Sequence, residues 1–372
     1  MTTTEKVLLA DYTTLRLGGP AARFVVTAGD SELVAAVQAA DQVAEPVLVL
    51  GGGSNLVVAD EGFSGVVVRA ASCGLRFTAQ DDAVEVTASA GQDWDDLVRQ
   101  CLAAGLAGIE CLSGIPGSAG ATPIQNVGAY GQEVAETICG VMAYDRQAGT
   151  LVSLNPDDLA FGYRTSMFKR QARSAAGGAH DGAASQATGR FVVLDVTFRL
   201  PVSPLSAPIR YAELGGLLGV PQGGRVPLAD ARAAVLELRR GKGMVLDEND
   251  PDTRSAGSFF TNPVVTQDEF GELTARLAGR GDGGMPHWPA EDGQVKLSAA
   301  WLIEQAGFGK GFRLAGDAGG ARISTKHTLA LTNPGHGSTA SLIRLARTIR
   351  DGVRATFGVE LENEPTLVGV KL

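Results

Sequence analysis

Apolar positions in the first third of the chain change repeatedly between helix-like and strand-like spacing. Residues 30–41 carry apolar side chains at intervals of three and four, which predicts an amphipathic helix capped by Asp30 or Ser31. Its buried stripe is expected to consist of Leu33, Val34, Val37 and Ala40. Short apolar runs predict three strands, at residues 46–50, 65–69 and 83–87. A second helix is predicted near residues 94–104, so helices and strands are interleaved in this region.

The middle of the chain contains longer strand patterns. Residues 140–154 predict a hairpin around a turn at residues 146–149, and the alternation in residues 191–200 predicts a long strand. Residues 170–190, between them, are rich in Ala, Gly, Ser and Gln and have no periodicity. We expect a mobile surface insertion there, with no chemistry of its own.

The last third of the chain begins after a proline-dense segment at residues 201–208, which predicts a domain boundary. Helical spacing predicts one helix at residues 228–240 and a longer one within residues 338–357. The capping signals of the longer helix are Ser338 or Thr339 at its start and Gly358 at its end. Its outward face is expected to be solvated and carries Arg344, Arg347, Arg350 and Arg354.

The length of 372 residues predicts two or three domains, at about 100–200 residues each. A hydrophobic share of 44% is enough for a large core, and the interleaved elements predict an α+β fold. The chain has 49 glycines among its 372 residues, a share nearly twice the average of about 7%. Because they are scattered, a collagen-like fibre is excluded, and they indicate many turns or backbone that lies close to a ligand.

Charge and residue usage exclude several classes of protein. A net charge of −9 argues against nucleic acid or an anionic membrane as the main partner, because both need a cationic surface. No apolar run approaches the roughly 20 residues of a membrane helix, and the start lacks a signal-peptide pattern. We therefore expect a cytoplasmic protein with reduced cysteines and no metal site. Neither the cysteines nor the histidines have the spacing of metal ligands. The cysteines are Cys73, Cys101, Cys111 and Cys139, and the histidines are His180, His287, His327 and His336.

Two glycine-rich segments in the first part of the chain suit a nucleotide. The loop at residues 51–55 lets backbone amides approach a diphosphate, and Ser54 and Asn55 add side-chain donors. It is not a GxGxxG fingerprint, because Leu56 stands where the last glycine belongs, and no P-loop pattern occurs. Ordering the stretch at residues 113–131 would cost much conformational entropy and bury little apolar surface. A bound cofactor would offset this cost, so the stretch favours one. A tight turn and an unliganded glycine loop are the alternatives.

Three further motifs carry polar groups suited to chemistry. Arg164, between aromatic residues, presents a planar fork that binds a carboxylate or phosphate, unless it forms only a surface salt bridge. Ser258 precedes Phe259 and Phe260, which would keep water from its hydroxyl, unless it only caps a strand start. The motif is not GxSxG, so hydrolase chemistry is not indicated. The last motif places three acids on one face of a strand, or in an exposed row: Glu360, Glu362 and Glu364.

Five motifs occur in a fixed order along the chain: LGGGSN, SGIPGSAGATPIQNVGAYG, YRTSMFK, GSFFTNP and LENE. In this combination the chain resembles the UDP-N-acetylenolpyruvoylglucosamine reductase family from Thr14 to Gly369. Tyr211, in the segment IRYAEL, indicates the branch with a substrate-covering tyrosine loop. The resemblance implies NADPH-dependent, FAD-mediated reduction of UDP-N-acetylglucosamine enolpyruvate to UDP-N-acetylmuramate, a step of peptidoglycan precursor synthesis.

The resemblance also implies an α+β fold with a two-part FAD-binding domain of the vanillyl-alcohol-oxidase type, which differs from a Rossmann domain. We expect FAD-binding subdomains at residues 1–72 and 73–205, and a substrate-binding domain at residues 206–372. FAD is expected to be bound non-covalently, and neither glycine-rich segment contains a histidine. The expected partners are NADPH and the enolpyruvyl sugar nucleotide, and the expected oligomeric state is a monomer.

The implied reaction delivers hydride to the β-carbon of the enolpyruvyl group, so that negative charge develops at the α-carbon and its carboxylate. Arg164 corresponds to the family arginine that stabilises this enolate, Glu364 to its acidic partner, and Ser258 to the proton donor to the α-carbon. The positions that correspond to FAD contacts are Gly51, Gly52, Gly53, Ser54, Asn55, Ser113, Gly114, Pro116, Gly117, Ser118, Gly120, Ala121, Gln125, Asn126, Gly128, Tyr130 and Gly131. The positions that correspond to substrate contacts are Tyr163, Tyr211, Lys242, Asn262, Gln305 and His327.

The chain departs from the family pattern in four places. Insertions at about 170–190 and 276–294 leave the placement of local loops open, and Thr261 stands where many relatives have lysine. Pro365 follows Glu364 and removes a backbone donor, which leaves the placement of this glutamate open. Two alternatives remain, a flavin oxidase or dehydrogenase with another substrate and a non-catalytic nucleotide-binding protein. The three candidate catalytic side chains favour the reductase, because binding alone needs no proton donor.

Overall fold

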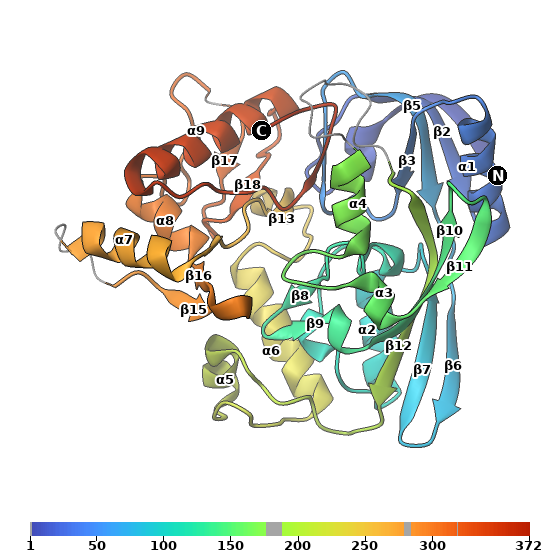
Figure 1. Cartoon of the computed structure of the whole chain (residues 1–372), viewed down its shortest axis with the longest axis horizontal. Coiled ribbons are helices and arrows are strands. Elements are labelled where there is room, and N and C mark those ends of the chain that lie inside the picture. Colours follow the sequence, from blue (N-terminus) through green and yellow to red (C-terminus); the bar gives the residue numbers. More distant parts are fainter. Residues whose placement is uncertain (1, 176–187, 279–283, 318) are drawn as a thin grey trace.

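A computed structural model describes residues 2–175, 188–278, 284–317 and 319–372 of the chain. Figure 1 shows two sheets on the right of the molecule and the helices of the C-terminal part on the upper left. Helix α6 (Leu228–Gly241) lies between these two groups. We therefore expect a ligand-binding site where the two sheets, α6 and the C-terminal part meet.

The first sheet is built from residues 2–70. Its order is β1 (Thr2–Leu8), β2 (Pro20–Thr27), β5 (Phe63–Ala70) and β3 (Val47–Leu50). Strands β2 and β3 run parallel to β5, and helix α1 (Asp30–Gln42) connects β2 to β3. Leu33, Val37 and Ala40 of α1 are buried against the sheet, and Val34 is partly buried. The predicted helix and the first two predicted strands are confirmed.

The start of α1 differs from the prediction. Its N-cap is Gly29, with φ −157°, and no side chain caps the helix, so the prediction of Asp30 or Ser31 as cap is wrong. Both residues lie inside the first turn, where the carboxylate of Asp30 suits the positive end of the helix. Glycine is also an accepted N-cap residue, so a helix that begins one residue earlier than predicted is compatible with this sequence.

The second sheet is antiparallel throughout and follows the order β11, β10, β12, β7, β6. These strands span Thr150–Leu154, Ile138–Asp145, Phe191–Pro201, Ala83–Ser89 and Leu75–Gln80. The predicted hairpin and the predicted long strand are confirmed as β10–β11 and β12. Helix α2 (Trp94–Ala103) packs on this sheet through Trp94, whose ring lies 5.6 Å from that of Phe198.

The C-terminal part has its own core around α9 (Thr339–Phe357). As predicted, Ser338 caps α9 by accepting a hydrogen bond from the amide of Ser341, and Gly358 ends it in the left-handed conformation. The other elements are α5 (Ala212–Leu218), β13 (Ser255–Ser258), β14 (Val264–Val265), α7 (Gln267–Ala278), β15 (His287–Pro289), β16 (Val295–Leu297), α8 (Ala299–Gln305), β17 (Arg322–Ile323) and β18 (Ala330–Thr332). The sheets in this part follow the orders β13–β18–β17 and β14–β16–β15.

The last residues return to the first part of the chain. Strand β19 (Thr366–Val368) pairs in parallel with β4 (Leu56–Val58), directly after loop 51–55. Of the two alternatives for the three acids, a shared strand face is excluded, because β19 begins only after them. Glu360 and Glu362 are exposed, whereas Glu364 is turned inward. Pro365 precedes β19, so its missing N–H removes no bond from the β4–β19 ladder.

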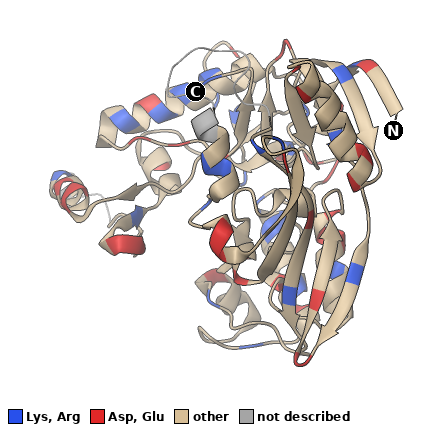
Figure 2. Cartoon of the chain, turned by 45° about the vertical axis from the view of Figure 1, so that its right-hand side comes forward, with Lys and Arg blue, Asp and Glu red and all other residues tan. Residues whose placement is uncertain are grey.

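Both predicted insertions lie partly outside the described residues. Of the first, residues 170–175 continue helix α4 (Met167–Ala175), and residues 188–190 lead into β12. Of the second, β15 is described. Among described helices, none is both long and apolar enough to cross a membrane. Figure 2 shows Lys and Arg positions interspersed with Asp and Glu positions along the ribbon of the elements in view.

Candidate active site

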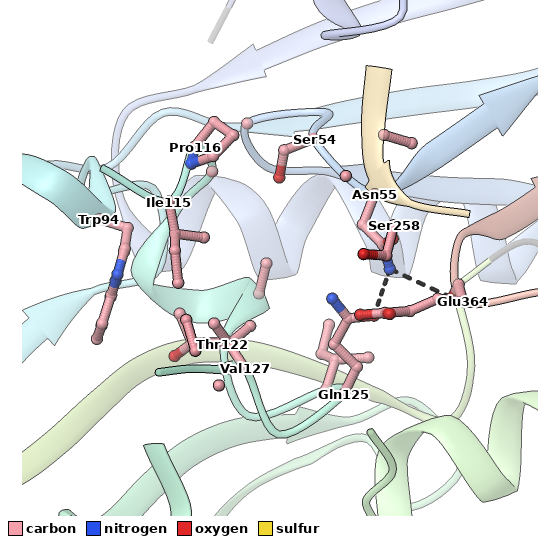
Figure 3. A pocket seen from close by; sticks show the side chains of 18 of the residues that line it. Ser54, Asn55, Trp94, Ile115, Pro116, Thr122, Gln125, Val127, Ser258 and Glu364 are labelled. Carbon is pink, nitrogen blue, oxygen red and sulfur yellow. Dashed lines mark hydrogen bonds between the residues drawn. The ribbon is translucent and has the colours of Figure 1, made fainter. Parts of the chain in front are cut away.

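A cavity of about 480 Å³ opens where loop 51–55, stretch 113–131, α4, α6, β13 and the C-terminal segment meet. Figure 3 shows Ser54 and Asn55 on one wall, Trp94, Ile115, Thr122 and Val127 on another, and Ser258 with Glu364 at one end. Of the predicted FAD contacts, the lining includes Gly51, Gly52, Gly53, Ser54, Asn55, Pro116, Gly117, Ser118, Ala121, Gln125, Gly128 and Tyr130. The two glycine-rich segments therefore share one cavity.

Glycine is required where the two segments meet. A Cβ atom on Gly52 would lie 2.6 Å from the Cα atom of Gly117, so backbone packs directly on backbone. Gly53 has φ +62°, and a Cβ there would lie 1.9 Å from the carbonyl oxygen of Tyr12. Beyond this contact, Asn55 donates a side-chain hydrogen bond to Gln125 and a longer one, of 3.5 Å, to the carbonyl of Glu364 (Figure 3).

Five predicted FAD contacts do not line the cavity and instead hold its walls: Ser113, Gly114, Gly120, Asn126 and Gly131. The Ser113 hydroxyl is fully buried and donates to the carbonyl of Glu110 at 2.7 Å. Gly120 packs on Ala90, which a Cβ atom would approach to 2.6 Å. The Asn126 amide donates to Glu133 at 2.7 Å and to the carbonyl of Gly162 at 3.1 Å. Membership in the motif therefore does not by itself place a residue in the cavity lining, and these five residues stay predictions as FAD contacts.

Arg164 and Glu364 form an ion pair at the end of the cavity. Nε of Arg164 lies 3.4 Å from Oε1 of Glu364, and the side chains are only 21% and 14% exposed. The Arg164 guanidinium also donates to the carbonyls of Asn126 at 3.3 Å and Gly128 at 2.5 Å. Because a Cβ on Gly128 would lie 2.9 Å from Nη1, glycine there lets the guanidinium lie against the main chain.

Ser258 ends β13 and lines the same cavity as the ion pair. It lies opposite Ala330 of β18, and its side chain is partly exposed. The next two residues, Phe259 and Phe260, are buried in the C-terminal core with their rings 5.1 Å apart. The predicted burial of these two rings is confirmed, and it fixes the strand end that carries the hydroxyl.

A cationic and aromatic group lies at another wall of the cavity. Nζ of Lys242 lies 5.5 Å from the ring centre of Tyr130 and 6.0 Å from that of Tyr211, and the two rings meet edge to face at 5.4 Å. Lys242 is also paired with Glu213, with Nζ and Oε2 2.5 Å apart. Burial raises the pKa of Tyr130 to about 12, so its phenol stays protonated at neutral pH.

The imidazole of His327 lines the cavity as well. Burial, and then the positive charges of Lys242 and Lys310, lower the pKa of His327 to about 4. The ring is therefore neutral at neutral pH and offers one donor and one acceptor.

Three predicted substrate contacts lie outside this cavity. Tyr163 and Asn262 line a neighbouring cavity of about 650 Å³, and the Asn262 side chain accepts a hydrogen bond from the amide of Ala299 at 3.0 Å. Burial raises the pKa of Tyr163. Gln305 is exposed at the end of α8. The structure therefore does not bring these residues together with Lys242 and Ser258.

Two cations of the cavity were missing from the predicted site. Lys169 lies in the YRTSMFK motif, which was noted for its arginine alone. Arg239 is buried, donates to the carbonyl of Met244 at 2.7 Å, and has an Nε atom without a hydrogen-bond partner among the described residues. Burial lowers the pKa of Arg239 to about 10. Arg239 lies about one helical turn before Lys242, and this spacing was the signal in the sequence that could have assigned it to the same site.

These features fit an anionic dinucleotide such as FAD. The two segments offer main-chain groups without side-chain obstruction, and the buried, incompletely bonded guanidinium of Arg239 suits a ligand with negative or carbonyl oxygens. No group of three or more His, Cys, Asp or Glu among the described residues could hold a metal ion.

Two family models match separate parts of the chain. The family model "FAD binding domain" matches residues 21–155, and the model "UDP-N-acetylenolpyruvoylglucosamine reductase, C-terminal domain" matches residues 250–368. These matches confirm the predicted α+β fold with an FAD-binding part and a C-terminal domain.

Relatives of the same name span nearly the full length. The protein of Thermobifida fusca is 54% identical over 371 residues, which cover 99% of this chain and 98% of that protein. The protein of Salinispora arenicola is 54% identical over 366 residues, covering 98% and 95%. The crystal structure of UDP-N-acetylenolpyruvylglucosamine reductase from Thermus caldophilus matches with a TM-score of 0.63 and 26% identity, over 99% of this chain and 100% of that one. The chain belongs to the UDP-N-acetylenolpyruvoylglucosamine reductase family.

Proposed function

We propose that the protein reduces UDP-N-acetylglucosamine enolpyruvate to UDP-N-acetylmuramate, with FAD as bound cofactor and NADPH as reductant, in peptidoglycan precursor synthesis. The observation that carries this proposal is the convergence of Arg164, Ser258 and Glu364 on one cavity walled by both glycine-rich segments. Bound FAD would supply the chemistry of taking up hydride from NADPH and donating it to the substrate. Loop 51–55 and the lining residues of stretch 113–131 would hold it.

Arg164 suits the negative charge that develops when hydride reaches the β-carbon. Its guanidinium has five N–H donors, more than the two carbonyls and one carboxylate that it meets in the protein. The remaining donors can bind the substrate carboxylate as its charge grows. Because these contacts fix the guanidinium before the reaction, it needs little reorganisation during the reaction.

Glu364 and Ser258 complete the arrangement. The Glu364 carboxylate orients Arg164 by facing its Nε atom, which leaves for the ligand the Nη hydrogens that are not bonded to the carbonyls of Asn126 and Gly128. The Ser258 hydroxyl, at the end of a strand fixed by buried phenylalanines, would transfer its proton to the α-carbon. The phenol of Tyr130 and the imidazole of His327, both neutral, can donate hydrogen bonds without adding charge.

The diphosphate of the sugar nucleotide is assigned to Lys242, with Tyr130 and Tyr211 beside it. An ammonium within about 6 Å of two ring centres is attracted by the aromatic faces, which helps to hold it in place. Tyr163, Asn262 and Gln305 stay predictions as substrate contacts. None of them lines this cavity, although the Tyr163 ring centre lies 5.7 Å from the guanidinium carbon of Arg164.

We further infer a cytoplasmic monomer with units at residues 1–72, 73–205 and 206–372. The separate sheets at residues 2–70 and 75–201, and the distinct core around α9, support this division. Light scattering of the purified protein tests the oligomeric state, and a dimer would contradict this part.

The central test follows the flavin spectrum of the purified protein. We expect yellow protein that is bleached by NADPH without oxygen and recovers its colour on addition of UDP-N-acetylglucosamine enolpyruvate. Recovery with unrelated acceptors, but not with this substrate, would instead support an oxidase or dehydrogenase of the same fold. Colourless protein that takes up no FAD would contradict both.

A further inference from the structure

The side chain of Lys169 links helix α4 to the C-terminal segment. Its Nζ atom donates hydrogen bonds to the main-chain oxygen of Arg164 at 3.3 Å and to that of Glu364 at 3.2 Å. Lys169 is partly buried and lines the cavity, and Figure 1 shows α4 between the sheets and the C-terminal part. One ammonium group therefore joins the backbones of the two residues whose side chains form the ion pair.

The backbone at Arg164 is held in an unusual conformation. Its φ of +53° lies in the left-handed region, which residues other than glycine keep only when their surroundings fix them. Gly162 and Thr165 close the turn on either side with two mutual hydrogen bonds of 3.1 Å. Lys169 holds the carbonyl of the residue inside this turn, and hydrogen bonds from a charged donor are the strong ones.

The backbone at Glu364 is fixed from three directions. Its amide donates to the carbonyl of Phe259 at 2.8 Å, next to Ser258. Its carbonyl accepts from Lys169 and, at 3.5 Å, from the side chain of Asn55 in loop 51–55. The contact with Lys169 thus relates the position of Glu364 directly to that of Arg164 through the main chain.

We propose that Lys169 is a positioning residue for the reduction of the substrate, and that it acts by fixing the separation between the backbones of Arg164 and Glu364. This inference rests on the proposed roles of these two residues. Removal of the ammonium leaves both side chains present but no longer fixes the relative position of the segments that carry them. We expect the reduction of the substrate to become slower, because this step uses the Arg164–Glu364 pair and small misplacements of reacting groups lower its rate strongly.

The test separates the two half-reactions in a stopped-flow instrument. For Lys169→Met we expect unchanged bleaching of the flavin by NADPH, an unchanged flavin spectrum, and reoxidation by the substrate about 10²-fold slower, with a small change in its concentration dependence. Lys169→Arg, which keeps a charged donor that can reach both carbonyls, is expected to restore most of the rate. The matched control is Lys6→Met, at an exposed lysine of β1 outside the cavity lining.

A double-mutant cycle shows whether Lys169 acts through the pair. In a Glu364→Gln background, Lys169→Met is expected to slow reoxidation far less than in the wild type, since the pair is already lost. Losses that multiply independently, a wild-type rate in Lys169→Met, or a joint loss of flavin, thermal stability and both half-reactions would each overturn the proposal. If the substrate fails to reoxidise the wild-type protein, the proposed function fails first.

Discussion

Arg164 and Glu364, about 200 positions apart in the chain, meet with Nε and Oε1 only 3.4 Å from each other. Each side chain is brought there by a different contact: Arg164 by the carbonyls of stretch 113–131, and Glu364 by its backbone bond to Phe259. Since both are largely shielded from water, the pair is weakly screened, and its geometry matters more than that of a surface salt bridge.

Arg164→Lys is expected to slow reoxidation of the reduced protein by the substrate about 10²-fold or more, because an ammonium cannot reproduce a fork with fixed donors. Bleaching by NADPH should change little. Rapid-mixing absorbance at the flavin band measures both rates. A substrate step at the wild-type rate would remove Arg164 from the mechanism.

Ser258→Ala removes the proposed proton donor without altering the buried phenylalanines beside it. We expect the substrate half-reaction to fall by about 10²–10⁴-fold, the usual contribution of general acid catalysis, with the NADPH half-reaction intact. The matched control is Ser255→Ala, three residues earlier in the same strand. Equal losses in both half-reactions would show that the hydroxyl is structural.

Arg239→Met tests the cation that the sequence patterns missed. Its Nε atom is buried and has no hydrogen-bond partner among the residues that the structure describes. The charge is therefore expected to favour ligand binding while lowering the stability of the unliganded protein. We expect FAD affinity to fall about tenfold, as for the loss of one charge-assisted hydrogen bond, with equal or higher stability of the FAD-free protein. Fluorescence titration with FAD measures this. Arg240→Met, at the exposed neighbour, is the control, and unchanged FAD affinity in Arg239→Met would contradict the prediction.

Glu213→Gln should free Lys242 from its carboxylate partner. The pair is half-exposed, so its strength is modest, and the affinity for the sugar nucleotide is expected to rise by about 2- to 5-fold. Glu237→Gln removes an exposed carboxylate from α6 and serves as control. Titration with UDP-N-acetylglucosamine measures the change, and weaker binding would show that Glu213 supports Lys242.

Acid sensitivity is expected to depend on Asp145, at the turn of hairpin β10–β11. Hydrogen bonds from Arg190 lower the pKa of Asp145 well below its ordinary range, to about 2. A carboxyl whose pKa is lower in the folded state stabilises the protein above about pH 4, and this contribution is lost as the pH falls toward 2. Asp145→Asn should therefore lower the unfolding free energy at pH 7 and flatten its dependence on pH in this window. Urea unfolding at pH 3 and pH 7 measures both, with the exposed Asp82→Asn as control.

The sequence by itself determined the elements and the family. The periodicities of α1, α2, α6 and α9 and the alternation of β10–β12 are local properties, since the spacing of apolar side chains follows directly from helix and strand geometry. The five motifs, read together, determined the family, and they contain Arg164, Ser258 and Glu364.

Only the tertiary structure decided which motif residues face the ligand cavity. Ser113, Gly120 and Asn126 belong to the same stretch as Gly117 and Gln125, but they do not line the cavity and instead contact other parts of the protein. Lys169, which lies in a motif but was given no role, and Arg239, which lies outside all five motifs, both line the cavity. The physical reason is that a cavity is formed by segments distant in the chain. The pairing of β19 with β4 turns Glu364 toward Arg164, and such long-range packing leaves no periodic trace in the sequence around either residue.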